Sequence, residues 1–448
     1  MPVLLTTLPP EVLELVASPL SLDDLRSLRL VNRDLAVAIA KGRYLNHFKS
    51  KRLLLTSDDL LHFQKGLRNG GPTYALEQLT LVGPVVASDA EISEDQIEQR
   101  AAALATAWQA LNIHTPTCRL RHLALEVDTH PNYEWITVMA PVRRSSYPVP
   151  DNYQSVLRSA RLTFRVTIQA LERCTLPLDS LDLFGTIPRC SLPMGELWWL
   201  WDRQTTAPWM TGLRNLTISI TPSRSSSVRD DETACSIEMS QQVPSALELL
   251  TDPQALVRFL KAAPSLSKLS VRHYDAYGVQ YMNPNTARSA SFAGHLHWID
   301  PIAKDVSLLH LSTLTLRHTY ATEAGLARLF SGSPLRSLTL EYVHLTKGGS
   351  FQNVLKLISG PRRTVQLQYL AIADLWKDRL MRFPIPWKGD EGDQMFGDDK
   401  YGPNHVYVGN SDDLNELIKI ACDTSQQSGE IEYVFWLQYC RLQFGPPS

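Results

Sequence analysis

The sequence lacks paired cysteines and an excess of positive charge, two features that identify large classes of proteins. Among its 448 residues are only six cysteines, which do not form C-x-x-C pairs: Cys118, Cys174, Cys190, Cys235, Cys422 and Cys440. Isolated cysteines of this kind are typical of reduced thiols and indicate neither a disulfide framework nor a zinc knuckle. The 44 Lys and Arg nearly balance the 46 Asp and Glu. We therefore expect no nucleic acid among its partners, since no bulk positive charge would attract one.

Long apolar runs and catalytic motifs are missing too. The amino-terminal segment has neither the basic start nor the apolar core of a signal peptide, and no run of about 18 apolar residues could span a bilayer. The sequence contains no G-x-S-x-G, H-E-x-x-H or G-x-x-x-x-G-K-[ST] motif and no kinase signature. We expect a cytoplasmic or nuclear protein with no membrane contact, no cofactor, no metal and no catalytic activity. An enzyme whose catalytic residues assemble across the fold is the alternative.

The first 48 residues contain three short helix patterns. Thr6 or Thr7 is expected to cap a first helix with a Pro-Pro pair in its first turn, where a missing N–H costs nothing. Ser21 followed by Asp24 is a capping-box pattern for a second helix, and a third is expected over about residues 32–40. Helices this short cannot bury all of their apolar side chains. The module therefore needs a neighbour or a partner.

The stretch "LPPEVLELVASPLSLDDLRSLRLVNRDL" resembles the F-box family. The matching positions are Leu8, Pro9, Glu11, Val12, Leu13, Val16, Leu20, Asp24, Leu25, Leu28, Val31, Asn32 and Arg33. Leu35 departs from the family, in which many members carry Trp near this position. The resemblance implies an F-box domain over residues 4–48 that binds a Skp-type adaptor and, through it, the cullin scaffold of a ubiquitin ligase.

The same resemblance implies which residues contact the adaptor. These adaptor-binding candidates are Leu8, Pro9, Pro10, Glu11, Val12, Leu13, Val16, Leu20, Leu25, Leu28 and Val31. The alternative for this segment is a helical cap at the amino end of a repeat domain.

The hexamer L-x-x-L-x-[LIV] occurs eight times after the helical module. The copies begin at Leu76, Leu120, Leu178, Leu213, Leu266, Leu311, Leu335 and Leu367. Their spacing varies from 24 residues (Leu311 to Leu335) to 58 (Leu120 to Leu178), whereas compact leucine-rich repeats recur every 20 to 29 or so. Helix signals lie between the hexamers, beginning at Ser57, Asp252 and Thr322 and over residues 350–361.

Alternating strands and helices predict an α/β fold. We expect parallel strands on the concave face of an arc with helices outside, and this pattern resembles an irregular leucine-rich-repeat solenoid over residues 50–448. Inserted loops are expected near 141–153, 222–236 and 383–405, the second with candidate phosphorylation sites at Ser225–Ser227. The third loop is acidic and is either solvated or a contact for a basic substrate. Residues 411–424 and 431–440 are expected to form a closing helix and strand.

Two further stretches carry side chains that are common in binding sites. "ELWWLWDRQTTAPW" holds Trp198, Trp199, Trp201 and Trp209. We expect a helix packed onto the body, and an aromatic recognition pocket is the alternative. "HLHWID" holds His295, His297 and Asp300, but no further His or Cys follows at a spacing that would complete a metal site.

These features favour a non-catalytic substrate-recognition subunit of a cullin-RING ubiquitin ligase. The helical module would bind the ligase and the repeat domain would bind a protein target, which makes ubiquitin transfer effectively intramolecular. An F-box scaffold that binds the adaptor without directing ubiquitination is the alternative. The sequence identifies neither the target nor the residues that bind it.

Overall fold

The structure is a computed structural model of the chain. It describes residues 8–41, 43–68, 75–85, 93–114, 120–128, 151–174, 176–185, 190–202, 208–221, 253–273, 298–345, 348–359, 367–373, 375–377, 379–382, 405–408 and 426–427. Most of the three predicted loops lies outside these ranges, as do the closing helix and strand expected over 411–424 and 431–440. The first loop was placed slightly too long, because residues 151–153 already belong to a helix.

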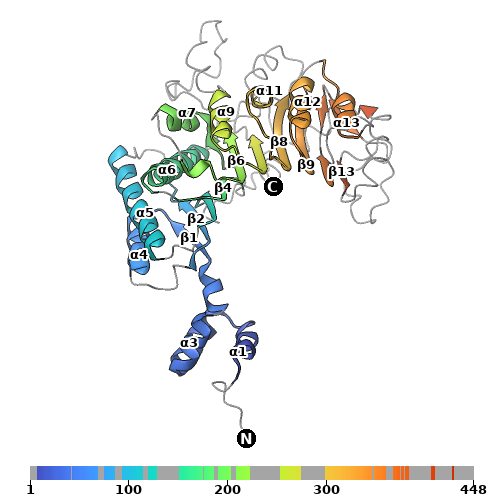
Figure 1. The fold of residues 1–448 in the computed structure, drawn as a ribbon. Helices are drawn as coiled ribbons and strands as arrows, with labels where there is room; N and C mark the ends of the chain where they lie inside the picture. The colour runs from blue at the N-terminus through green and yellow to red at the C-terminus, as the bar shows by residue number, and fades with distance from the viewer. Residues whose placement is uncertain are drawn as a thin grey trace, which may run out of the picture.

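One sheet of mainly parallel strands forms the body of the protein (Figure 1). Its main strands are β1 (Ser50–Leu54), β2 (Gln78–Gly83), β3 (His122–Val127), β4 (Ser180–Leu183), β6 (Asn215–Thr221), β7 (Lys268–His273), β8 (Thr313–Ala321), β9 (Ser337–Leu345) and β10 (Tyr369–Ala373). Each pairs in parallel with the next, so spatial order follows chain order. All eight hexamers form strands, which confirms that prediction, and β1 is a ninth strand that the hexamer did not reveal.

Shorter strands lie beside these. β5 (Leu192–Pro193) pairs in parallel with β6, and β13 (His405–Val408) runs antiparallel to β10. β11 (Trp376–Lys377) pairs with β9 and with β12 (Arg379–Arg382), which in turn pairs with β14 (Gln426–Gln427).

Alternation along each strand separates an apolar face from a polar one. In β8, Leu314 and Leu316 are fully buried, whereas Thr313, Thr315 and Arg317 are only partly buried. Successive side chains of a strand point to opposite faces of the sheet. The fixed leucines of the hexamer therefore face the helices, and the variable positions between them face the other way.

The helices that the structure describes cover one face of the sheet, on the outside of the arc that Figure 1 shows. They are α4 (Ser57–Arg68), α5 (Glu94–His114), α6 (Asp151–Arg173), α7 (Met194–Asp202), α9 (Gln254–Lys261), α11 (Ile299–Asp305), α12 (Glu323–Ser331) and α13 (Phe351–Ser359). Helices α4, α9, α12 and α13 confirm the helix signals in the sequence, and α7 confirms the helix expected over the tryptophan-rich stretch. The Thr322 hydroxyl caps α12 by accepting a hydrogen bond from the Gly325 N–H. Helices α5 and α6 had no such signal.

A repeated backbone hydrogen bond sets the register of these strands. The carbonyl oxygen of the residue before a strand accepts two N–H groups from the next strand unit. Thus the Arg214 carbonyl accepts from Ser267 (2.7 Å) and Lys268 (2.9 Å), and the Ser267 carbonyl accepts from Ser312 (2.8 Å) and Thr313 (3.1 Å). The same arrangement recurs at every step from β1 to β10, excepting the short β5.

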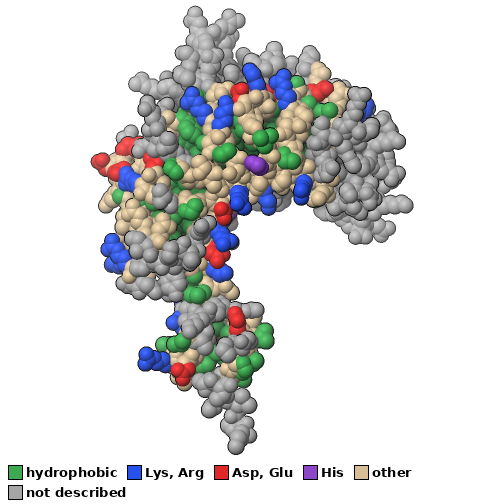
Figure 2. Space-filling view, in the orientation of Figure 1, with side chains coloured by type: hydrophobic (Ala, Val, Ile, Leu, Met, Phe, Trp, Pro, Cys, Tyr) green, Lys and Arg blue, Asp and Glu red, His purple; other side chains and the backbone are tan. Residues whose placement is uncertain are grey.

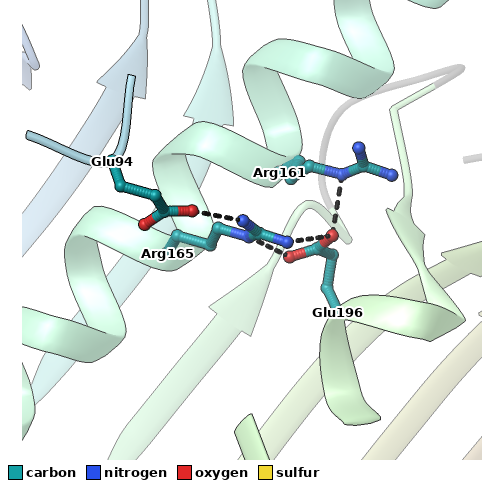
Figure 3. Close-up of polar contacts among 4 residues, drawn as sticks. All are labelled: Glu94, Arg161, Arg165 and Glu196. Carbon is teal, nitrogen blue, oxygen red and sulfur yellow. Dashed lines mark hydrogen bonds and ion pairs between the residues drawn. The ribbon is translucent and has the colours of Figure 1, made fainter. Parts of the chain in front are cut away.

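An ion-pair network joins three of the outer helices (Figure 3). Glu196 of α7 is 3% exposed and pairs with Arg161 and Arg165 of α6, each through a guanidinium Nε at 2.7 Å. The Nη1 of Arg165 also lies 3.0 Å from the carboxylate of Glu94 in α5. Because both arginines are more exposed than the buried glutamate, the network satisfies its carboxylate at a modest desolvation cost.

The amino-terminal helices have a separate small core. Helices α1 (Pro10–Ala17), α2 (Leu22–Val31) and α3 (Arg33–Lys41) and the 3-10 helix η2 (Arg43–Phe48) form this N-terminal module, which extends from one end of the arc (Figure 1). The buried side chains of its core are Leu13, Ala17, Leu25 and Leu35, and they form a cluster distinct from that of the sheet.

The caps of these helices agree only in part with the sequence. The predicted Ser21–Asp24 capping box is present, with both reciprocal hydrogen bonds. The predicted threonine cap of α1 is wrong, because the helix begins at Pro10 and Pro9 occupies the capping position without a side-chain hydrogen bond. Pro9 and Pro10 together delay the start of the helix, since proline holds φ near the helical value but disfavours a helical residue before it.

We expect Leu25→Ala to unfold the N-terminal module while the sheet stays folded. Leu25 is fully buried in a core of four side chains, and a leucine-to-alanine change at such a site costs about 2 to 5 kcal/mol. Hydrogen exchange should accelerate in α1 to α3 and stay unchanged in β6 to β9. Leu30→Ala is the matched control because Leu30 is 88% exposed. Loss of protection in the strands as well would contradict the independence of the two cores.

Candidate functional site

Among the described residues of the N-terminal module, six aliphatic side chains are exposed. They are Val12, Leu15, Val16, Leu30, Val31 and Val37, which we call the apolar module surface. Val12, Leu15 and Val16 recur at helical spacing on one side of α1, and Leu30 and Val31 end α2 at 88% and 74% exposure. Figure 2 shows hydrophobic side chains on the outside of this projecting module. Exposed apolar surface of this density is typical of protein interaction sites.

The structure divides the adaptor-binding candidates between this surface and the module core. Pro9, Val12, Val16 and Val31 are exposed, Leu8, Leu20 and Leu28 are half-buried, and the side chains of Pro10 and Glu11 lie outside the described residues. Leu13 and Leu25 are buried at 4% and 0% exposure, where they hold the helices together and offer no surface. Sequence comparison with a family pattern cannot separate these classes, because it retains core and contact positions alike.

Three residues of the apolar module surface were not among the candidates. Leu15, Leu30 and Val37 lie at positions that the family pattern leaves variable. Helical spacing supplies a signal for Leu15, which follows Val12 by three residues. No comparable signal marks Val37.

A second candidate site lies on the sheet face opposite the helices, which we call the polar sheet face. Besides Lys268 at the start of β7, its charged members from β1 to β9 are Arg52, Glu126, Asp182, Arg272, Arg317 and Glu341. Arg52 and Glu126 form an ion pair across β2 at 3.0 Å. Arg317 and Glu341 are register partners on β8 and β9, and the Nε of Arg317 lies 2.7 Å from the Glu341 carboxylate. These pairs neutralise both ends of the row.

The middle of the row differs, because its charges are buried. Arg272 on β7 is 4% exposed, and desolvation by burial lowers its pKa, as does the neighbouring charge of Arg317. Asp182 on β4 is 6% exposed, and burial raises the pKa of its carboxyl to about 6, although the Gly185 N–H donates a 2.7 Å hydrogen bond to it. The sheet face therefore holds a buried acid and a buried base that lack a direct ion pair with each other among the described contacts.

Stacked aromatic side chains continue this face at the carboxyl ends of β8 and β9. His318 stacks on Tyr342 with ring centroids 4.5 Å apart, and Tyr320 stacks on His344 at 4.6 Å. His318 and Tyr342 have positive φ angles of 54° and 52°. Since the strands pair again after this point, both bulge at the same position, which keeps them in register and stacks the rings.

The tryptophan-rich stretch packs onto the body, as the sequence predicts. Trp209 is 3% exposed and meets Phe259 edge to face, and Trp201 donates from Nε1 to the Ala255 carbonyl at 3.2 Å. Arg165 lies over the Trp199 ring, with Cζ 5.0 Å from its centroid. These contacts join α7 to α6 and α9, so an open aromatic pocket is not formed by these side chains.

The described residues hold no cluster of side chains that could ligate a metal ion. Asp300 accepts a hydrogen bond from the Thr322 hydroxyl, and His295 and His297 lie outside the described residues. Burial raises the pKa of the Cys174 thiol to about 12 and raises that of Cys190 further, so neither provides a thiolate nucleophile near neutral pH. None of the helices in the described ranges combines the length and hydropathy that a bilayer span requires.

Comparison with known proteins adds no assignment. The sequence matches no protein-family model, and a search of the curated proteins finds no match. The F-box and leucine-rich-repeat resemblances therefore rest on the residues of the sequence.

We expect Asp182→Asn to stabilise the protein at neutral pH. The folded-state pKa of Asp182 lies about two units above its ordinary value, so the folded state binds the proton more tightly and loses stability as pH rises from about 4 to 6. Asparagine avoids the buried charge and can still accept the Gly185 hydrogen bond. The free energy of unfolding at pH 7.5 should rise by about 1 to 3 kcal/mol.

Denaturant unfolding at pH 4 and pH 7.5 measures this effect. Asp179→Asn is the control, because Asp179 precedes the same strand but is exposed. Equal stability of the Asp182→Asn variant and the natural sequence at pH 7.5 would show that Asp182 carries no desolvation penalty.

Proposed function

We propose that this chain is a non-catalytic receptor subunit that links a protein target to a cullin-RING ubiquitin ligase. In this proposal the N-terminal module is an F-box domain that binds a Skp-type adaptor, and the body is an irregular leucine-rich-repeat solenoid that binds the target. The chain brings target and ligase together and thereby raises the effective concentration of the target lysine near the ubiquitin thioester.

The observation that carries the proposal is the apolar module surface. The described residues of the module bury four side chains in its core and leave six aliphatic ones exposed, and the described part of the rest of the chain exposes four other large hydrophobic side chains. Leaving aliphatic side chains in water costs free energy that a partner can recover by covering them. The F-box resemblance of the same module implies that this partner is a Skp-type adaptor.

The body supports the second half of the proposal. Its sheet presents a face free of helices, lined by the variable positions of each hexamer, and Figure 1 shows that this face lines the inside of the arc. The leucines that build the fold all point the other way. Residues on this face can therefore vary to suit a target without loss of the core.

We expect Val12→Asp combined with Val16→Asp to abolish adaptor binding. Both side chains are about 40% exposed on one side of α1, so an interface there would have to bury two unpaired carboxylates. Recovery of the Skp-type adaptor with tagged chain should fall at least tenfold. Leu309→Asp is the matched control, because Leu309 is 68% exposed on the body. Undiminished recovery of the adaptor with the double variant would refute the assignment.

The same purification separates a ligase receptor from a scaffold. A receptor should recover the cullin together with the adaptor, and both should be lost in the double variant. Recovery of the adaptor without the cullin would favour a scaffold that does not direct ubiquitination. Hydrogen exchange in α1 to α3 verifies that the double variant keeps the module folded.

A further inference from the structure

Arg272 occupies an unusual position on the polar sheet face. It is 4% exposed, and its Nε is buried without a hydrogen-bond partner. In register it lies between Ser219 of β6 and Arg317 of β8, so its neighbour along the sheet is a like charge. No ion pair of this guanidinium with a described residue offsets its burial, and proteins rarely bury a charge without a partner.

The nearby carboxylates do not satisfy Arg272. Glu341 contacts Arg317 with both oxygens, through Nε at 2.7 Å and Nη2 at 3.4 Å. Asp182 accepts the Gly185 N–H and attracts Arg272 only at longer range. Among the residues that the structure describes, no carboxylate therefore forms a direct ion pair with Arg272.

The approach to Arg272 is basic. Along β7 the outward side chains change from exposed Lys268 through half-buried Ser270 to buried Arg272, over about 13 Å of strand. Arg214 and Arg336, which precede β6 and β9, are also exposed. Figure 2 shows Lys and Arg side chains along the inner rim of the arc below these strands. Such a rim attracts an acidic group toward the buried end of β7.

We propose that Arg272 binds a carboxylate of a ligand that enters along β7. A planar guanidinium pairs with a carboxylate through two parallel hydrogen bonds, and its free Nε is one donor of such a fork. A monoanion would neutralise the charge of Arg272, whereas a dianion would be repelled more strongly by Asp182 and Glu341. The carboxylate belongs either to an acidic side chain of a protein or to a small organic acid.

This inference deepens the proposed receptor function by naming the chemistry of the captured group. Its test needs neither adaptor nor cullin, so the two proposals can fail separately. A chain that binds carboxylates but no adaptor would leave the present inference standing, and the reverse result would leave the ligase proposal standing.

The experiment measures the rise in Tm of the full chain with added carboxylate at constant ionic strength. The probes are acetate, propionate, and amidated pentapeptide pools that carry either Glu or Gln at the centre. We expect stabilisation by at least one small acid, or by the Glu pool and not the Gln pool, and the responding probe identifies the source. Arg272→Gln should weaken that binding by about thirtyfold. Arg328→Gln, an exposed change on α12, should not.

Two further variants separate binding from folding. Asp182→Asn should strengthen carboxylate binding severalfold, because it removes a nearby negative charge. Arg272→Met should abolish binding, yet leave the ligand-free Tm unchanged or higher, since replacing a buried charge by an apolar side chain of similar size is often stabilising.

Several results would overturn the inference. These are no carboxylate-dependent rise in Tm, an equal rise in Arg272→Gln, or a larger response to inorganic phosphate than to every carboxylate probe. A lower ligand-free Tm of Arg272→Met would assign Arg272 to the fold instead.

Discussion

The body of this protein depends on one backbone interaction, the carbonyl oxygen that accepts two N–H groups from the next strand unit. Repeated from the Lys49 carbonyl to the Arg336 carbonyl, it fixes where each strand begins relative to its neighbour. A register slip of one residue would turn every leucine of a strand away from the helices. The segments between strands can differ greatly in length, because these hydrogen bonds constrain only the start of each strand.

A fixed register also creates the polar sheet face. Outward positions of successive strands fall into rows, so charges far apart in the sequence become neighbours, as Arg317 and Glu341 do. The same rows place Arg272 beside Arg317, and its Nε has no hydrogen-bond partner. Burial disfavours the charged forms of these side chains: desolvation raises the pKa of Asp182 and lowers that of Arg272.

The N-terminal module follows a different constraint. Too short to bury its own apolar side chains, it divides them between a core around Leu25 and an exposed surface around Val12 and Leu30. The two ends of the proposed receptor thus differ in chemistry: an apolar surface for the constant partner, and a polar face for the variable one. Such a division allows the target to change without altering the contact with the ligase.

The sequence alone specified the eight repeat strands, five of the outer helices and the capping box at Ser21, because these depend on local periodicity and on side chains within a few residues of each other. It could not separate Leu13 from Val16, nor assign α5 and α6, because burial depends on which other element lies against a helix. The sequence did not indicate that Arg272 is buried beside a like charge, because both properties depend on the residues that the strand register places next to it. Only the tertiary structure decided which charges are paired, because pairing is set by distances between residues that the sequence separates by dozens of positions.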